Sequence, residues 1–400
     1  MQPAFDSWAT KTFNATASDL TGLILGKPAF IYEAAAGVQT ISAVVKSESQ
    51  AIVDAMTFTQ VTTESGVKAL KVDLKQTWST TFWYWNGDFI VDIYVPKHAL
   101  QLVNLDGRGD VALFPNTLTT RSLGIELSGS GSVFIQDTSS LTFDHLDLDV
   151  SGSGRIQVDV PSIALTELDA SLSGSGAIVL STATIVAPSV ETDISGSGDI
   201  YILATKGLNV TAQLATSVSG SGRITLADAG TCGTHEAELS GSGSIQAGSM
   251  ACQMAEAKLS GSGSMYLSSA VSIDVEKSGS GTVAVVGRAP HQVNGAIEVT
   301  TSNPVTRVAL AAFPAHTASH SFKFGTGLLV ILGVVLVVVL FIVIKKVRNR
   351  CRRRRDSQHE EPHAAIPYGV ATTPVPVVMV EVVPEAQIVN DPKGPEEKFV

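Results

Sequence analysis

The tetrad Ser-Gly-Ser-Gly recurs through the middle of this chain and constrains its fold more than any other feature. A degenerate copy, Asp106-Gly107-Arg108-Gly109, precedes the intact ones by 22 residues. A flexible linker would not return at a near-constant interval, so the recurrence indicates a repeat architecture in which every tetrad has the same structural role. The eight intact copies, 18 to 24 residues apart, begin at Ser128, Ser151, Ser173, Ser195, Ser219, Ser240, Ser260 and Ser278.

The residues on either side of the tetrads alternate between polar and apolar, as in "LDLDV-SGSG-RIQVDV". This period of two indicates strands with one buried face. The glycines between the strands mark a bend where a positive φ or close backbone packing is needed. These structural glycines are Gly129, Gly131, Gly152, Gly154, Gly174, Gly176, Gly196, Gly198, Gly220, Gly222, Gly241, Gly243, Gly261, Gly263, Gly279 and Gly281.

The length of one repeat fits one coil of a β-solenoid. A repeat of about 22 residues at about 3.3 Å per residue has a contour of about 70 Å, which accommodates two short strands and two turns. Turn-forming residues half a repeat beyond the tetrad, such as Val160-Pro161-Ser162, provide the second turn. We therefore predict an all-β parallel solenoid of about nine coils, in which the tetrads align as a ladder along one edge.

The repeats also suggest where the chain divides. The pair Asn86-Gly87, in an aromatic segment ahead of the repeats, is a strong hairpin signal. We expect residues 1–26 to be poorly ordered or truncated, 27–313 to form the solenoid ectodomain and 314–323 to form a stalk. Within the ectodomain we expect a cap and first irregular coils at 27–105, tetrad coils at 106–285 and a C-terminal cap at 286–313.

Residues 324–344 form an uncharged apolar run. As a helix, a run of this length spans the roughly 30 Å hydrocarbon layer, so we predict one transmembrane helix. Eight basic residues lie within 345–355, whereas the preceding flank offers only Lys323. The positive-inside rule then places the N-terminal part outside and residues 345–400, a basic and Pro/Val-rich tail predicted to be disordered, in the cytoplasm.

This topology implies the plasma membrane or another secretory-pathway membrane, yet the first 20 residues show no signal peptide. The interpretation we prefer is that the sequence begins downstream of the true start. The alternative is that the single helix alone inserts the chain. Beyond the membrane, a cytoplasmic partner for the tail is possible.

Several side chains are candidates for covalent modification. Cys232 and Cys252 each lie eight residues before a tetrad, so stacking brings them within disulfide range. Cys351 follows the apolar run among arginines and is a palmitoylation candidate, with an inert thiol as the alternative. Asn14 and Asn209 begin N-glycosylation sequons.

Charge and histidine placement exclude several functions. Residues 1–324 carry 17 basic and 29 acidic groups, which argues against nucleic acid as a partner. The eight histidines recur at no common repeat position, so we predict no catalytic site, no cofactor and no enzymatic activity. We also predict no metal site: only Asp199 follows an intact tetrad where calcium-binding rolls need an acid in every turn, and Cys232 with His235 is too few ligands.

The serial tetrads between short alternating strands, together with "LVNLDGRGDV" from Leu102 to Val111, resemble the putative auto-transporter adhesin, head GIN domain family. The likeness covers roughly residues 25–300. It implies a right-handed, two-sheeted β-helix with a Gly-Ser-Gly motif at the tight turn, an adhesive role and no established catalytic site. The predicted transmembrane helix and tail depart from the family pattern.

These observations favour a single-pass surface protein whose solenoid binds an extracellular glycan or protein ligand by multivalent contact. Arg108-Gly109-Asp110 is a weak adhesion tripeptide, because its Gly-Asp part is already explained as a turn like Gly198-Asp199. Two rival functions stay open. One is a carbohydrate-active β-helix enzyme, and the other is a structural or signalling membrane protein that acts through its tail.

Overall fold

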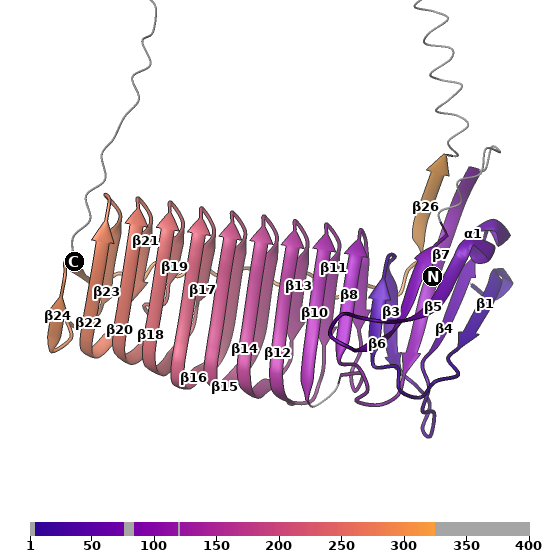
Figure 1. Cartoon of the computed structure of the whole chain (residues 1–400), viewed down its shortest axis with the longest axis horizontal. Helices are drawn as coiled ribbons and strands as arrows, with labels where there is room; N and C mark the ends of the chain where they lie inside the picture. The colour runs from indigo at the N-terminus through magenta and orange to yellow at the C-terminus, as the bar shows by residue number, and fades with distance from the viewer. Residues whose placement is uncertain (1–4, 76–83, 119–120, 325–400) are drawn as a thin grey trace, which may run out of the picture. The chain divides into compact units, whose positions relative to one another are not determined.

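Each tetrad joins two strands that belong to different sheets, and successive repeats stack as the coils of an all-β solenoid (Figure 1). The computed structural model describes residues 5–75, 84–118 and 121–324. The chain divides into two units, Met1–Ile331 and Leu332–Val400, and all described residues belong to the first. The predicted all-β solenoid of about nine coils is confirmed, with tetrad corners from Gly107 to Gly279.

The first sheet, which we call sheet one, contains the strands that lead into the corners. Its strands pair in parallel from one end of the stack to the other. In stacking order they are β6 (Lys68–Leu74), β2 (Gly22–Leu25), β8 (Leu102–Gly107), β10 (Ser122–Gly129), β12 (Leu141–Gly152), β14 (Ser162–Gly174), the later parts of β15 (Ala177–Gly196) and β16 (Asp199–Gly220), β18 (Gly230–Gly241), β20 (Met250–Gly261), β22 (Ser269–Ser278) and β24 (Gln292–Asn294).

The second sheet, sheet two, contains the strands that leave the corners, and it is also parallel. The strands β15 and β16 run on through the second turn and therefore contribute to both sheets. In stacking order sheet two contains β7 (Tyr84–Val95), β3 (Ala29–Glu33), β9 (Asp110–Leu113), β11 (Ser132–Gln136), β13 (Arg155–Asp159), the first parts of β15 and β16, β17 (Arg223–Leu226), β19 (Ser244–Gln246), β21 (Ser264–Leu267), β23 (Thr282–Val286) and β25 (Glu298–Thr300).

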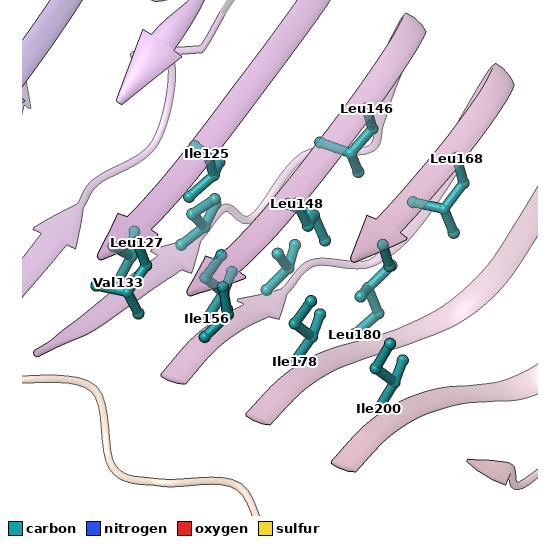
Figure 2. Close-up of a cluster of buried hydrophobic side chains, with 14 of the residues drawn as sticks. Ile125, Leu127, Val133, Leu146, Leu148, Ile156, Leu168, Ile178, Leu180 and Ile200 are labelled. Atoms are coloured by element: carbon teal, nitrogen blue, oxygen red, sulfur yellow. The ribbon is translucent and has the colours of Figure 1, made fainter. Parts of the chain in front are cut away.

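The core consists of columns of inward aliphatic side chains from both sheets (Figure 2). On sheet one, Leu127 pairs in register with Val150, the residue before the next tetrad, and both are buried. On sheet two, Val133 and Ile156 are paired and buried in the same way. Burying one such side chain contributes about 1.5–3 kcal/mol, so the repeated pattern supplies the main stabilisation of every coil.

Antiparallel elements close the N-terminal end of the stack. The strand β5 (Met56–Thr62) pairs with β6, and β4 (Ser42–Ser47) pairs with both β7 and β1 (Ala9–Asn14). The helix α1 (Gln50–Ala55) buries Ile52 and Val53 against these strands, and a short 3-10 helix spans Phe5–Ser7. This closure covers the strand edges that a solenoid would otherwise leave unpaired.

Two expectations for this end differ from the structure. Residues 1–26 contribute β1 and β2, because Leu23 and Leu25 are fully buried and β2 is paired on both sides. The pair Asn86-Gly87 forms no hairpin turn: it lies inside β7, where it pairs with Phe322 and Ser321. Strand pairing with β26 overrides the local turn preference.

After the last coil, residues 302–318 run back along the outer face of sheet two, and we call them the strap. The Gln157 side chain donates to Ala311 O and accepts from Ala311 N, both at 2.9 Å, while Gln246 Oε1 accepts from Thr306 N at 2.9 Å. The strand β26 (Ser319–Phe324) then pairs antiparallel with β7 (Figure 1). Of the segment expected as a C-terminal cap, β24 and β25 extend the last coil. The rest of that segment and the expected stalk 314–323 return to the closed end.

Within the described residues, no helix is long and apolar enough to cross a membrane. Apart from Phe324, the last residue of β26, the predicted transmembrane segment 324–344 lies outside these residues. The predicted cytoplasmic tail 345–400, with Cys351, lies outside them as well.

Candidate binding face

The tetrad corners are held by the close approach of successive coils. The first glycine of each corner has a φ between +108° and +144°, a region that favours glycine. A Cβ atom on Gly152 would lie 2.4 Å from Gly129 O, and one on Gly154 would lie 2.4 Å from Gly131 O. The same close approach allows Gly129 O to accept a hydrogen bond from Ser153 N at 2.8 Å. Both glycines are therefore required by sterics, and the corner fixes the register of the coils.

The corners present two rows of serine hydroxyls. The first serines of successive tetrads are paired in register, from Ser128 with Ser151 to Ser260 with Ser278. The third-position serines are exposed in all eight tetrads. One hydroxyl pair links neighbouring corners in the described part of the chain, Ser242 Oγ and Ser262 Oγ at 3.2 Å. Most of the donor and acceptor capacity of this edge therefore faces outward.

A shallow groove of about 490 Å³ lies beside the last four corners of sheet one. Lys258 Nζ donates to Glu238 Oε1 at 2.9 Å, and this hydrogen bond raises the pKa of Lys258. Lys277 takes the position that an aliphatic residue holds before the other tetrads, which adds a second ammonium group. The groove combines serine hydroxyls with charges of both signs, and its residues are Ser217, Val218, Ser219, Glu238, Leu239, Ser240, Lys258, Leu259, Ser260, Glu276, Lys277 and Ser278.

Farther from the corners, the outer face of sheet one carries a stripe of carboxylates. Asp169 pairs in register with Asp147 on one side and with Glu191 on the other. Partial burial, followed by repulsion from these two neighbours, raises the pKa of Asp169 to about 6. The pKa of Asp149 is raised in the same way, by partial burial and by Glu126. The carboxylates of the stripe therefore repel one another at neutral pH.

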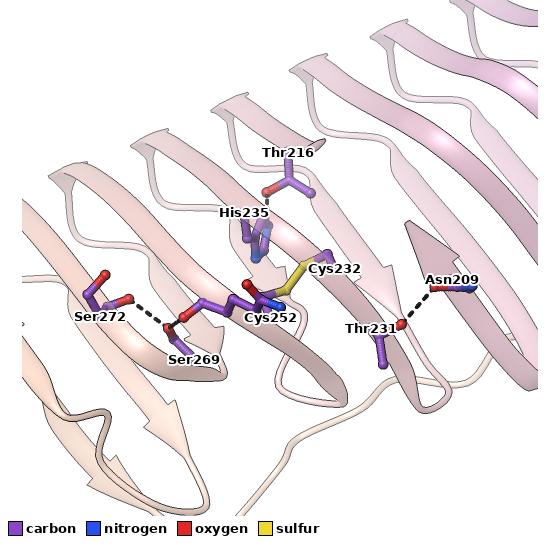
Figure 3. Close-up of a disulfide and its surroundings, with 9 residues drawn as sticks. Asn209, Thr216, Thr231, Cys232, His235, Cys252, Ser269 and Ser272 are labelled. Atoms are coloured by element: carbon purple, nitrogen blue, oxygen red, sulfur yellow. Dashed lines mark hydrogen bonds between the residues drawn. A yellow bond between two sulfur atoms is a disulfide. The ribbon is translucent and has the colours of Figure 1, made fainter. Parts of the chain in front are cut away.

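The two predicted cysteines form a disulfide between neighbouring coils (Figure 3). Cys232 and Cys252 are paired in register on β18 and β20 with their Cα atoms 4.3 Å apart, and both side chains point into the core. The bond lies at the second turn of the coils, opposite the glycine corners.

The same region holds His235, a fully buried polar residue whose structural role the sequence did not reveal. Its Nε2 lies 3.0 Å from Thr216 Oγ1, while Nδ1 has no hydrogen-bond partner among the described residues (Figure 3). Burial lowers the pKa of His235 to about 4, so the ring is neutral at pH 7. A sequence signal exists: His235 lies five residues before its tetrad, where Leu146 and Leu168 stand in other coils.

The remaining predicted site residues lie apart from one another. Arg108 and Asp110 are exposed at the first corner, where the ring of Pro28 would crowd a side chain on Gly109. Asn14 is exposed at the end of β1. Asn209 is exposed near a second turn and accepts a hydrogen bond from Thr231 Oγ1 at 2.8 Å. The structure thus gathers only the tetrad residues into a continuous face.

In the described part of the chain, no group of three or more His, Cys, Asp or Glu side chains is placed to hold a metal ion.

The strap residues were the other group that sequence reasoning missed. His316 Nε2 lies 2.8 Å from Asp92 Oδ1, and its ring packs edge-on against Phe30 at 4.8 Å between centroids. Phe313 packs against Phe114 at 5.2 Å, so aromatic contacts fix the strap at the closed end.

Known structures resemble this chain at low identity. A putative adhesin from Parabacteroides distasonis is 18% identical, with a TM-score of 0.46 over 72% of this chain and 98% of that one. A putative lipid-binding protein from the same species is 20% identical, with a TM-score of 0.45 over 72% and 97%. A putative adhesin from Parabacteroides merdae is 17% identical, with a TM-score of 0.42 over 72% and 96%. No curated protein sequence matches the chain.

A family model matches residues 40–218 and 211–289, which together make up more than half of the chain. The matched region contains the eight intact tetrads and the degenerate copy. The resemblance noted in the sequence is thereby confirmed, and the chain belongs to the family described as putative auto-transporter adhesin, head GIN domain.

Proposed function

We propose that this protein is a single-pass cell-surface protein that uses its solenoid for adhesion through multivalent contact, without enzymatic activity. Residues 324–344 anchor it in the plasma membrane or another secretory-pathway membrane, and the coils wind right-handed, as parallel crossovers do. The observation that carries the proposal is the register of the corners. The same hydroxyl-bearing turn is repeated at every coil, so one weak contact is offered many times.

The chemistry of the corner edge fits a hydroxylated polymer, such as an extracellular glycan. Rows of exposed serines can exchange hydrogen bonds with sugar hydroxyls, and the groove near Lys258 and Glu238 adds charged partners. A protein surface is the other ligand class that such a repetitive edge can bind. An ectodomain that carries more acidic than basic groups favours either one over nucleic acid.

The test compares single and combined blocking substitutions in the full chain, held in nanodiscs and applied to a glycan array. Ser153→Tyr, Ser175→Tyr and Ser242→Tyr place bulk at three separate corners. Multivalent contact predicts less than about threefold loss of affinity for each single change and about 30-fold or more for the triple variant. Complete loss from one substitution, or binding to no glycan, would contradict the glycan-adhesion proposal.

The rival functions make different predictions. Turnover of a polysaccharide by the full chain would indicate an enzyme on this fold. Deletion of residues 356–400 should leave adhesion unchanged if the solenoid is the working part. Loss of adhesion on that deletion would instead point to a function that depends on the tail and its cytoplasmic partner.

A further inference from the structure

The two ends of the solenoid are built differently. At the N-terminal end, β5 continues sheet one beyond β6, and β4 continues sheet two beyond β7. At the C-terminal end, β24 pairs with β22 and β25 pairs with β23, and in the described part of the chain no further strand pairs with either one. The C-terminal end therefore offers two unpaired strand edges, and β24 is seen at this end of the stack in Figure 1.

The hydrophobic core is uncovered at this open end. Val293 continues the column of Ile273, and Val299 continues the column of Val285. Ile273 and Val285 are at most 1% exposed, whereas Val293 is 44% and Val299 54% exposed. An apolar core surface that ends beside free strand edges is a feature that needs a partner, because it exposes both apolar area and backbone hydrogen-bonding groups.

The chain's own later segments leave this end. The strap runs from the last coil back to sheet two's first strands, and β26 pairs with β7 at the closed end. Under the proposed function, on which this inference rests, the chain enters the membrane directly after β26. No described segment after the last coil covers the open end, which leaves another molecule to cover it.

We propose that the open ends of two copies of this chain pair with each other, by antiparallel contact of β24 with β24 and of β25 with β25. A two-fold arrangement centred on Val293 sets Gln292 opposite the second copy's Asn294, which are complementary amides. Centred on Val299, it sets Glu298 opposite Thr300. Neither pairing opposes like charges, and the valines of the two cores meet at the centre.

The closed end limits this association to two copies. Head-to-tail stacking would need an uncovered core at both ends, and at the N-terminal end α1 buries Ile52 and Val53 against β1, β4, β5 and β7. An isologous pair is the closed alternative. It also places the two closed ends, where β26 precedes the proposed membrane segment, at opposite extremes of the pair, which suits contact between two facing membranes. The adhesive partner is then a second copy on an opposing surface.

The test uses phosphatidylcholine vesicles that carry the full chain, with clustering followed by light scattering. Val293→Asp and Val293→Lys each bring like charges together at the two-fold axis, so vesicles with either variant alone should cluster about tenfold more slowly or worse. Mixed Asp and Lys vesicles should recover clustering, because the opposed charges now attract. Recovery also shows that both variants are folded.

The matched control is Val186→Asp, at a valine of similar exposure (41%) in the middle of the solenoid, which should cluster like the unsubstituted chain. Two results would overturn the pairing while leaving a surface-binding function in place. One is clustering that Val293→Asp does not affect, and the other is adhesion of the protein-bearing vesicles only to vesicles without protein. No adhesion in any arm, including the glycan array, would overturn the proposed function as well. In detergent, sedimentation should give a dimer for the unsubstituted chain and a monomer for either variant alone.

Discussion

The two turns of each coil follow opposite rules. At the glycine corner, each first glycine has a positive φ and sits against the backbone of the coil before it, from Gly129 to Gly279. At and just beyond the second turn, the pairing shifts register, as between Thr182 and Thr184 or between Val210 and Gln213. One turn sets the register of the stack and the other absorbs differences in repeat length. The 18-to-24-residue drift in tetrad spacing is therefore compatible with a regular solenoid.

This comparison separates two sources of stability. The corner has no space for a side chain in place of its glycines, and it carries little apolar surface of its own. The second turn tolerates bulges and is stabilised locally by the Cys232–Cys252 bond, and the buried His235–Thr216 pair lies three residues beyond Cys232 on sheet one. Substitutions at the two turns should therefore lower the free energy of unfolding by different amounts.

The largest difference should come from glycine substitution at the two turns. Gly152 and Gly207 have nearly the same φ, +135° and +137°, but a Cβ atom on Gly207 would lie 3.5 Å from its nearest neighbour, Ala229 O. Gly152→Ala should lower the free energy of unfolding by about 4 kcal/mol, and Gly207→Ala by about 1–2 kcal/mol, because only the first adds a backbone clash to the φ strain. Urea denaturation measures both, and equal losses would remove the distinction between the turns.

The disulfide should have the next largest effect. It closes a loop of 20 residues, and constraining the unfolded chain in this way is worth about 3 kcal/mol. The double substitution Cys232→Ala and Cys252→Ala should lower the free energy of unfolding by about that amount. Thermal denaturation should show the same loss for the unsubstituted chain under reducing conditions, while the double variant should not respond to reductant.

His235 should make stability depend on pH. Its pKa is about 4 in the folded state and 6.5 when unfolded, so the unfolded chain takes up the proton first and stability falls as the pH drops from about 6.5 towards 4. Replacement by leucine, with Thr216→Ala to leave no buried hydroxyl unpaired, should reduce the loss between pH 7 and pH 5 by about 2 kcal/mol. An unchanged pH profile would show that the ring is not buried as a neutral group.

The smallest effect is expected on the carboxylate stripe, with the opposite sign. The raised pKa of Asp169 means that the folded state binds the proton more tightly, so stability falls as the pH rises from 3.8 through about 6. Asp169→Asn should raise the free energy of unfolding at pH 7 by about 1 kcal/mol, a figure reduced for solvent screening. The exposed Asp110→Asn should change it little, and equal gains from both would argue against repulsion within the stripe.

The sequence predicted those parts of the fold that repeat. Tetrad spacing and the period-two pattern placed the coils, the corner glycines and the two neighbouring cysteines. The strap was missed because it has no period and its partners, such as Gln157 and Gln246, lie on widely separated coils. The turn predicted at Asn86-Gly87 failed because the local preference is weaker than pairing with β26. His235 was detectable by aligning each coil on its tetrad.

The site could be predicted only as far as it repeats. The hydroxyl rows follow from the tetrads themselves, whereas the groove beside Lys258 depends on which side chains the register brings together. The open end was not foreseen, because the sequence does not show that the residues after the last coil turn back along sheet two. Long-range returns of this kind leave no local pattern to read.

The in-register stacking of the corners is tested most directly by cysteine cross-linking of exposed corner serines. With Cys351 replaced by Ser, the pair Ser173→Cys and Ser195→Cys lies in register on adjacent coils, at a strand spacing of about 4.8 Å that permits a disulfide. The pair Ser173→Cys and Ser219→Cys lies two coils apart and should not form one. Rapid oxidation of the first pair alone is the predicted result, and cross-linking of the second pair, or of neither, would contradict the stacked ladder.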